Sequence, residues 1–537
     1  MTVTQPLAGG QADTTQTAQR ALDQAVNHLL GLQHDQGWWQ GELETNVTMD
    51  AEDLLLREFL RVRTPDQTAA AARWIRSCQR EDGTWANFRG GHADLSTTVE
   101  AYVALRLAGD APDAAHMTRA ADWIRASGGI SATRVFTRIW LALFGEWPWD
   151  ELPVMPPEMI YLPAWFPLNV YDWACWARQT IVPLTIVCSL RPVRALPIDL
   201  NELQVPAAST GPAGFDGWSA VFGGLDRVLH RYEKRVGGLA PARAVRTAAM
   251  RRCAEWIIAR QERDGCWGGI QPPWVYSLIA LHLLGYGLDH PVIARGLAGL
   301  DRFTIWEESP DGPVRRLEAC QSPVWDTVLA MIGLADAGLP ADHPALRSAA
   351  GWVLDEEIHG PGDWQVRRPG LGPGGGWAFE FDNDGYPDVD DTAEVVLALR
   401  RVTWPTSAGG GSEDRARRGQ EATARAVRWL TGMQSRDGGW GEDLRSYDDP
   451  GWAGRGESAA SQTAWALLAL LAAGGPQEQG SIDCGVRWLA QAQRPDGTWD
   501  EPQFTGTGFP GDFYINYHLY RLVFPVSALG RYLGGPR

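Results

Sequence analysis

Three carboxylates lie within four residues of one another in the second half of the chain, at Asp388, Asp390 and Asp391. Pro387 fixes its own φ and disfavours helix at Tyr386, so we expect the acids to lie where a loop becomes a helix. Carboxylates this close repel one another, and apolar neighbours disfavour ionisation, so at least one should stay protonated near neutral pH. A protonated acid beside aromatic rings suits proton transfer to an electron-rich carbon–carbon double bond.

Two other interpretations of this acid cluster remain open from these residues alone. Aspartate is common at helix N-termini, where free backbone amides and the helix dipole favour it. A carboxylate pair could instead bind Mg²⁺, because hard cations take oxygen ligands. A glycine-rich aromatic segment, residues 374–381, precedes the cluster and an apolar run, residues 395–399, follows it. The rest of the chain has to decide between the three.

The composition describes a globular chain and excludes several classes of protein. The chain has 537 residues, which suggests two large domains, and it is 45% hydrophobic and 21% charged. A net charge of −17 argues against nucleic acid as the main partner. Its seven cysteines form no CxxC pair or zinc spacing and suit a reducing cytoplasm. Residues 1–18 lack signal-peptide features, and no run of about 18 apolar residues predicts a membrane-spanning helix.

A repeated motif predicts the architecture. Glutamine is followed four residues later by glycine and six residues later by tryptophan, at residues 33–39, 79–85, 261–267, 434–440 and 493–499. An apolar helical stretch precedes each copy, and period-2 alternation is almost absent. Each copy is typical of a helix, a glycine turn and a tryptophan opening the next helix, with the glutamine bonding free amides at that helix's N-terminus. We therefore predict an all-α chain of helical hairpins that closes into α/α barrels.

Two further segments differ from the repeats. Residues 146–168 are rich in proline and aromatic residues, so they should form a rigid connection that could line a cavity. Residues 218–258 mix arginine and lysine with apolar residues in an otherwise acidic protein. Such a segment is a candidate for lying on an anionic membrane surface. An ordinary solvated helix face would show the same pattern.

Taken together, these motifs resemble those of the squalene–hopene cyclase family, the protonation-initiated (class II) triterpene cyclases. The repeats match its Gln-Trp motifs, the acid cluster matches its acid motif, and residues 134–140, 321–327 and 506–520 also match closely. The resemblance covers about residues 20 to 533. It implies two α/α barrel (toroid) domains, which we place at residues 15–310 and 311–537. It also implies metal-free and cofactor-free polycyclisation of a long isoprenoid, squalene to hopene or hopanol.

The resemblance also implies roles for individual residues. Asp390 would protonate the terminal double bond, with Asp388 and Asp391 holding it acidic. Aromatic faces would stabilise the tertiary carbocations that follow, more so without water. The matching aromatic residues are Trp176, Trp325, Phe379, Phe509, Phe513, Tyr517 and Tyr520. The matching polar group that holds the water ending the reaction consists of Glu52, Glu100, Arg134 and Gln271.

The partners implied are squalene or a related polyprene, and a membrane from which this insoluble substrate would enter. We accordingly expect a peripheral, monotopic protein on the cytoplasmic face of a membrane, with no nucleic-acid partner. The family is often dimeric, so a homodimer remains an open expectation that no self-complementary face in the sequence supports.

The chain departs from the family pattern after Trp440, where residues 442–450 already match the segment that follows a later repeat. One to two repeats of helices are absent, and with them the family's histidine that hydrogen-bonds the donor aspartate; His518 is not its equivalent. The departure leaves alternatives open: a cyclase of shorter polyprenes, or a catalytically impaired or silent lipid-binding scaffold. A glycoside hydrolase would explain paired carboxylates but not the C-terminal match. A zinc prenyltransferase would need a metal triad that the sequence does not offer.

Overall fold

The computed structural model describes most of the chain. The described residues are 8–166, 169–172, 175–205, 240–358, 377–378, 395, 431–432, 434–441, 444, 456–473, 475–504, 506–509 and 513–534. The acid cluster and the junction at residues 442–450, apart from Leu444, lie outside these residues.

The described chain is mainly helical, as predicted, with a few short strands. The first part contains α1 (Ala8–Gly31), β1 (Leu43–Glu44), α2 (Thr48–Leu60), α3 (Pro65–Ser77), α4 (Leu95–Leu107), α5 (Ala115–Ala126), α6 (Val135–Leu143), α7 (Cys175–Leu190), α9 (Ala240–Ile258), α10 (Gln271–Leu283) and α11 (Pro291–Arg302). The second part contains β2 (Thr304–Glu307), β3 (Val314–Leu317), α12 (Pro323–Asp336), α13 (Pro344–Asp355), α17 (Ala460–Ala473), α18 (Gln479–Ala492), β4 (Gly506–Phe509), β5 (Phe513–Tyr517) and α19 (Tyr520–Tyr532).

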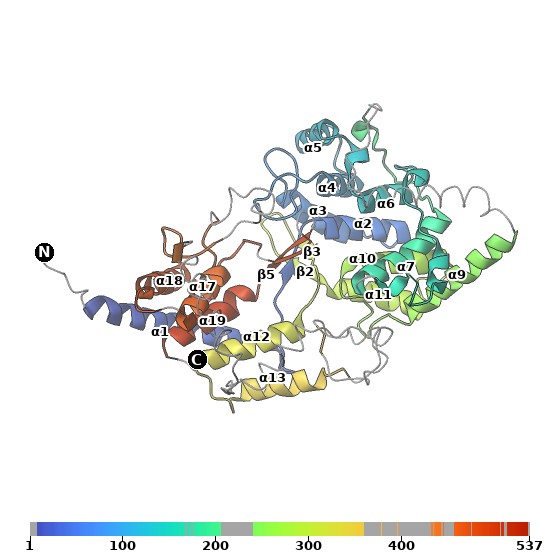
Figure 1. Cartoon of the computed structure of the whole chain (residues 1–537). Coiled ribbons are helices and arrows are strands. Elements are labelled where there is room, and N and C mark those ends of the chain that lie inside the picture. The colour runs from blue at the N-terminus through green and yellow to red at the C-terminus, as the bar shows by residue number, and fades with distance from the viewer. Residues whose placement is uncertain are drawn as a thin grey trace.

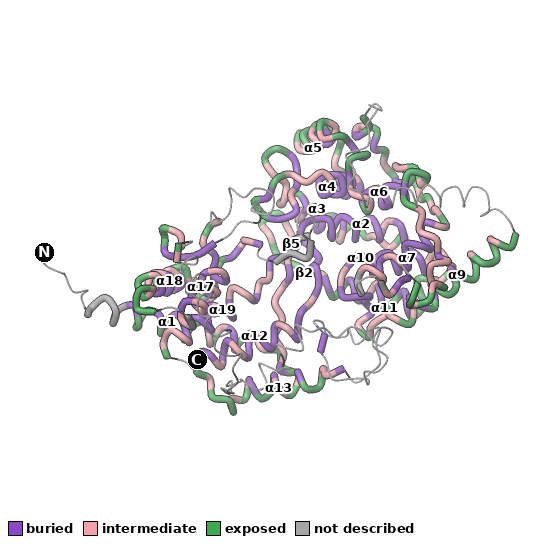
Figure 2. The backbone as a smooth tube through the Cα atoms, viewed as in Figure 1, coloured by how far each residue is buried: buried purple, intermediate pink, exposed green. Residues whose placement is uncertain are grey.

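The helices are of two kinds, which follows from their residue patterns. Helices α2, α4, α10 and α12 are buried on nearly all sides; α4, α10 and α12 are mainly apolar, whereas α2 also buries charged residues. Helices α3, α5 and α13 bury one stripe and expose the opposite face. Figure 2 shows the first kind in the interior and the second at the surface. Inner helices covered by outer ones are the arrangement expected of an α/α barrel.

Two separate hydrophobic cores hold the helices together. One is formed by α2 to α7 and α9 to α11, and the other by α12, α13 and α17 to α19. Helix α1 belongs to the second core although it opens the chain, and Figure 1 shows it beside α17, α18 and α19. The segment after α1 therefore crosses from the second core to the first. The boundaries at residues 15, 310 and 311 stay a prediction.

The Gln-Trp repeats act as staples, but not in the way predicted. In all five copies the glutamine side-chain amide donates to two backbone carbonyls, that of the glycine of its own turn and one in another helix. In four copies the second carbonyl lies near the start of that helix, and in the fifth it belongs to Ala21 inside α1. Gln33, for example, donates to Gly37 at 2.7 Å and to Ala345 at 2.9 Å. The prediction that glutamine bonds free amides is wrong, because its NH₂ group carries two donors that the turn aims at carbonyl oxygens.

In four of the five repeats the tryptophan is buried and donates its indole N–H to a backbone carbonyl of the preceding helix, ten residues earlier. Trp85 donates its indole N–H to Ile75, ten residues earlier, at 2.7 Å, and Trp267 does the same to Ile257 at 2.8 Å. The glycine of the turn has a positive φ, 96° at Gly265, where a Cβ would overlap the Arg295 carbonyl group. This explains why the position in the turn is glycine.

Two small antiparallel sheets lie between the helices. Strand β5 pairs with β1 and β4 in one sheet, with Leu43 opposite Tyr517 and Glu44 opposite Asn516. Strands β2 and β3 form the other, with Thr304 opposite Leu317. The sequence pattern did not predict these strands, because they are short and the β1–β5 pair joins the two ends of the chain.

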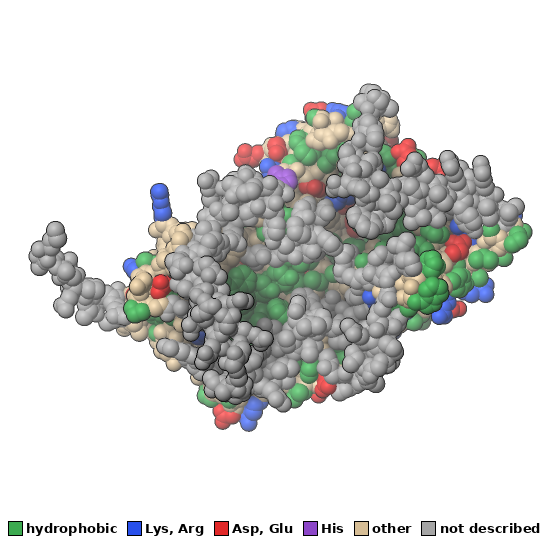
Figure 3. All heavy atoms as spheres, viewed as in Figure 1, with side chains coloured by type: hydrophobic (Ala, Val, Ile, Leu, Met, Phe, Trp, Pro, Cys, Tyr) green, Lys and Arg blue, Asp and Glu red, His purple; other side chains and the backbone are tan. Residues whose placement is uncertain are grey.

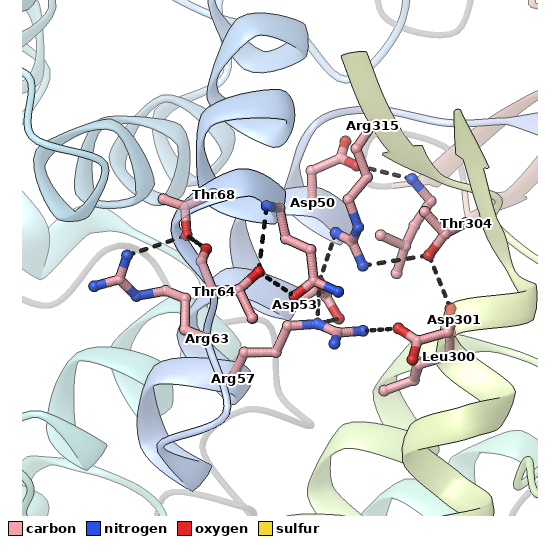
Figure 4. A network of polar contacts seen from close by, with 12 residues as sticks. Asp50, Asp53, Arg57, Arg63, Thr64, Thr68, Leu300, Asp301, Thr304 and Arg315 are labelled. Carbon is pink, nitrogen blue, oxygen red and sulfur yellow. Dashed lines mark hydrogen bonds and ion pairs between the residues drawn. The ribbon is translucent and has the colours of Figure 1, made fainter. Parts of the chain in front are cut away.

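A buried ion network ties α2 to β3 and α11 (Figure 4). Arg315 donates to Asp53 at 2.7 Å, and Arg57 bonds the same carboxylate at 2.9 Å and Asp301 at 2.7 Å. Burial disfavours ionisation of Asp53, but the two guanidinium groups outweigh it and lower its pKa. Because Asp53 follows Glu52 on α2, the network fixes the helix that carries one of the predicted site residues.

Candidate active site

The predicted polar group assembles from four different segments, and we call Glu52, Glu100, Arg134 and Gln271 the polar cluster. Glu52 lies on α2, Glu100 on α4 and Gln271 is the first residue of α10, and all three are buried. Arg134 precedes α6 and is half-buried. Gln271 donates to the Met49 carbonyl at 2.7 Å, which joins α10 to the start of α2.

The two carboxyl groups of the polar cluster perturb each other. Burial raises the pKa of Glu52 well above its usual range, and the nearby Glu100 carboxyl raises it further. Burial also raises the pKa of Glu100 to about 7, although Arg134 and a hydrogen bond from Thr137 oppose this rise. At neutral pH the pair therefore keeps at least one proton. A neutral acid beside a partly ionised one can both donate to and accept from a small ligand.

Tyr276 and Trp140, which sequence reasoning missed, lie beside the carboxyl groups of the polar cluster. Tyr276 of α10 is fully buried, and its pKa is raised by burial first and then by Glu52 and Glu100. Its ring centroid lies 5.7 Å from that of Trp140. Among the described residues, no hydrogen-bond partner is found for the Tyr276 hydroxyl, Oε2 of Glu100 or Oε1 of Gln271. Buried polar atoms of this kind suit a bound water molecule.

The signals for the missed residues were weak but present. Trp140 and Thr137 belong to the matched stretch 134–140, from which only Arg134 was chosen. Tyr276 lies in an apolar helix, where a tyrosine is typical of a core residue.

Three predicted aromatic residues also come together, and we call Trp325, Tyr517 and Tyr520 the aromatic wall. Trp325 of α12 donates its indole N–H to the Tyr520 hydroxyl at 3.2 Å. The rings of Tyr517 and Tyr520 stack with centroids 4.4 Å apart and planes 5° apart. The wall therefore joins α12, the end of β5 and the start of α19.

Two further aromatic residues extend the wall and were not predicted. Trp465 of α17 meets Tyr520 edge-on at 5.6 Å and Phe524 at 4.7 Å. Phe524 lies 5.2 Å from Tyr520, one helical turn along α19. Two sequence features could have identified them: Trp465 lies in the apolar run of α17, and Phe524 follows Tyr520 by four residues on α19.

The other predicted residues are described incompletely or not at all. Asp388, Asp390, Asp391 and Phe379 lie outside the described residues. For Trp176, Phe509 and Phe513 only the backbone is described: Trp176 lies in α7, and Phe509 of β4 is opposite Phe513 of β5 in the strand register. The hairpin thus ends beside Tyr517 of the wall.

The described surface is hydrophobic near the middle of the molecule. Figure 3 shows apolar side chains gathered in a recess there, on the face in view.

In the described part of the chain, one group of side chains lies close enough together to bind a metal ion. It consists of Glu262, Asp264 and Cys266 in the third repeat turn. Asp264 accepts from the Cys266 amide at 2.9 Å and Glu262 from the Gly268 amide at 3.0 Å, so these carboxylates hold the turn.

Comparison with known protein families accounts for almost the whole chain. The family pattern of the squalene-hopene cyclase N-terminal domain matches residues 22–309, and that of the C-terminal domain matches residues 321–420 and 412–534. The chain belongs to the squalene–hopene cyclase family. It is therefore a terpene cyclase of α/α barrel fold, an intramolecular transferase or isomerase, as predicted.

Individual relatives agree with this family. A squalene–hopene cyclase of Alicyclobacillus acidocaldarius is 41% identical over 96% of this chain and 97% of its own length. A squalene–hopene cyclase of Zymomonas mobilis is 31% identical over 99% and 98%. A dammaradiene synthase of Dryopteris crassirhizoma is 33% identical over 97% and 95%.

The same comparison bears on the internal departure. The alignment with the Alicyclobacillus cyclase extends over 634 residues, more than the 537 of this chain. That relative therefore contains residues with no counterpart here. The position of the gap after Trp440 stays a prediction.

Proposed function

We propose that this protein cyclises squalene to hopene or hopanol by protonating a terminal double bond. The observation that carries the proposal is that this family member has both an aromatic wall and a buried polar cluster with two carboxyl groups. The first suits a cation formed in an apolar chamber, and the second suits its quenching. The relatives named squalene–hopene cyclase support the choice of substrate.

The reaction begins at the acid cluster. Asp390 gives its proton to the terminal alkene, whose π electrons form the new C–H bond and leave a tertiary cation. Asp388 and Asp391 keep Asp390 acidic. Each following double bond attacks the cation before it, so that one carbon–carbon bond forms per step and the charge moves along the chain. The faces that stabilise this charge belong to Trp325, Tyr517 and Tyr520, together with Trp176, Phe379, Phe509 and Phe513.

The reaction ends at the polar cluster. A carboxyl pair that keeps at least one proton can hold a water molecule between Glu52 and Glu100, with Gln271 as a further acceptor. If that water adds to the last cation and loses a proton to the pair, hopanol forms. If the pair accepts, directly or through that water, a proton from a carbon beside the cation, hopene forms. In both cases the proton lost balances the one that Asp390 gave.

The substrate enters from a membrane against which one face of the protein lies. Trp165, Phe166 and Tyr161 are 81%, 41% and 52% exposed. Arg243 and Arg251 on nearby α9 are also exposed, and α9 packs against the turn that ends at Tyr161. Figure 3 shows apolar and basic atoms together on the part of the surface that α9 forms. In the described part of the chain, every helix is too short or too polar to cross a bilayer.

This membrane contact has its own test. Sedimentation with vesicles of phosphatidylglycerol should exceed sedimentation with phosphatidylcholine, and Trp165→Ser should reduce both. High salt should weaken binding to the anionic vesicles only. Equal binding by the Trp165 variant would contradict the assigned face.

The activity is tested with detergent-solubilised protein, squalene and a chelator, followed by mass spectrometry of hydrocarbons and alcohols. We expect turnover that the chelator does not affect and that Asp390→Asn abolishes. Turnover that survives Asp390→Asn, or that the chelator removes, would overturn the mechanism. Asp355→Asn, at the exposed end of α13, is the matched control and should keep full activity.

A second candidate is a cyclase of shorter polyprenes. It is favoured by the residues that the Alicyclobacillus relative has and this chain lacks. The same assay with farnesol-length and geranylgeraniol-length alcohols separates the two, since product from these alone would favour the second. Binding of squalene without any product would indicate a silent lipid-binding scaffold.

A further inference from the structure

His518 lies between two residues of the aromatic wall, Tyr517 and Tyr520, and holds them to the opposite end of the chain. Its Nε2 lies 3.0 Å from a carboxylate oxygen of Glu44, and its Nδ1 lies 3.4 Å from one of Glu42. Its backbone N–H also donates to the Glu42 carbonyl at 2.9 Å. One residue thus makes three polar contacts with the segment around β1.

The charges around His518 favour its protonated form. Burial opposes protonation, but hydrogen bonds to Glu42 and Glu44 outweigh it and raise the pKa of His518. The hydrogen bond from His518 is in turn the largest cause that lowers the pKa of Glu42 to about 2. Burial opposes ionisation of Glu44, yet His518 outweighs it and lowers that pKa also.

Charged groups of neighbouring segments also face this cluster. Arg316 of β3 bonds Glu42, and it bonds Glu307 of β2 at 3.1 Å. Arg521 on α19 opposes protonation of His518, and Arg89 favours ionisation of Glu44. The arginines thus keep both carboxylates ionised. Two carboxyl groups beside the same segment titrate near neutral pH together with His518: burial raises the pKa of Glu318, which faces Glu42, to about 7, and that of Asp326, which is bonded to Gly41, to about 8.

The segment that His518 contacts is also bonded to α12, the helix that carries Trp325 of the aromatic wall. The Gly41 amide donates to Asp326 at 2.8 Å, and Asp326 follows Trp325 on α12. Leu519, which follows His518, packs closely on Gly41. A Cβ atom added to Gly41 would lie 2.6 Å from the Cβ atom of Leu519. Both partners of the Trp325–Tyr520 hydrogen bond are therefore fixed to residues 41–44.

We propose that the contact of His518 with Glu42 and Glu44 is a positioning device that holds Tyr517 and Tyr520 in place for cyclisation. In this role His518 acts through the two tyrosines and not on the reacting atoms. The inference rests on the proposed cyclase function. A wall displaced by a fraction of an ångström faces the wrong carbon of the substrate, so the cation is quenched before the last ring closes.

The first test compares His518→Gln with the wild type in the squalene assay. Glutamine keeps a hydrogen-bond donor and loses the charge. We expect kcat to fall about ten- to a hundredfold, as for a misplaced catalytic group, with KM nearly unchanged and a larger share of incompletely cyclised products. His116→Gln is the matched control, because His116 makes a similar contact with Asp110, at 2.7 Å, far along the chain on α5. It should behave as wild type.

The pH profile separates positioning from a merely structural role. Wild-type kcat should fall as pH rises through the raised pKa of His518, because the imidazole then loses its charge. In Glu44→Gln the part of this fall that His518 causes should move to lower pH, and in His518→Gln that part should be absent, while the part that Glu318 and Asp326 cause remains in both variants. An undiminished fall in a folded His518→Gln protein would overturn the proposal.

A readout that needs no turnover keeps the two proposals separate. Protection of peptides from β5 and the start of α19 against hydrogen exchange, taken relative to the intrinsic exchange rate at each pH, should fall in His518→Gln at pH 6 to 7, and in the wild type only at high pH. Unchanged exchange in the variant would overturn the positioning role even if squalene is not a substrate. Faster exchange in a protein that makes no product from squalene would support the contact and count only against the proposed function.

Discussion

The indole N–H of Trp325 donates a hydrogen bond to the Tyr520 hydroxyl across 3.2 Å. This contact joins α12 to α19, helices separated by nearly 200 residues of chain. It fixes the edge of Tyr520, while the stacked ring of Tyr517 fixes its face. A tyrosine held from two directions presents a ring of fixed orientation, which an aromatic group must have to stabilise a cation at one position.

Tyr520→Phe should separate the hydroxyl from the ring. The variant keeps the three ring contacts of Tyr520 and loses a hydrogen bond, which contributes roughly 0.5–1.5 kcal/mol to the free energy of unfolding. We expect a loss of stability in that range and a shift toward incompletely cyclised products. A double-mutant cycle with Trp325→Phe measures the coupling, and a coupling of zero would contradict the contact.

Trp465 should act as part of the aromatic wall although it was not predicted. Its indole meets Tyr520 and Phe524 in edge and tilted geometry, and each aromatic pair contributes about 0.5–1.5 kcal/mol beyond burial. Trp465→Leu should therefore lower both stability and cyclisation rate, while Trp465→Phe should keep most of each. Trp38→Leu, which alters a ring stacked on His34 at 4.1 Å, is the control and should leave product composition unchanged.

The helical fold could be predicted because its signal is local and repeated. Five copies of one spacing fixed the turns, and the glycine of each turn has the positive φ that the spacing implied. The glutamine partners were predicted wrongly, because a side-chain amide serves equally as donor or acceptor and only the turn geometry decides which.

The site could be predicted only where a motif marked it. The polar cluster came from residues in four matched positions, whereas Tyr276 and Trp465 lie in apolar helices that do not distinguish a core ring from a site ring. The contact of His518 with Glu44 joins residues 474 apart in sequence. A contact between residues so far apart leaves no sequence pattern in either segment.

Glu100 should make both stability and product ratio depend on pH near neutrality. Its pKa is raised to about 7 in the folded chain, against about 4.3 unfolded. Between these values the folded state binds more protons, so this group lowers stability as pH rises through that window. Glu100→Gln should remove that slope, seen as a smaller change in melting temperature between pH 5 and 8.

The same variant should change how the reaction ends. As pH rises through about 7, wild-type Glu100 becomes a base, and the ratio of alkene to alcohol should change with it. In Glu100→Gln this change should disappear. A ratio that still varies with pH in the variant would assign the base elsewhere.

Asp53 should be far more important for stability than Asp301, although both bind Arg57. Asp53 and Arg315 are fully buried, whereas the Asp301 side chain is 54% exposed. Asp53→Asn leaves two buried guanidinium groups short of one negative charge, which typically costs about 3–5 kcal/mol. Asp301→Asn breaks a contact open to water and should cost at most about 1 kcal/mol. Denaturant unfolding of both variants measures the difference, and equal losses would contradict the burial of the network. Because Asp53 follows Glu52 on α2, Asp53→Asn should also shift the alkene-to-alcohol ratio, while Asp301→Asn should leave it unchanged.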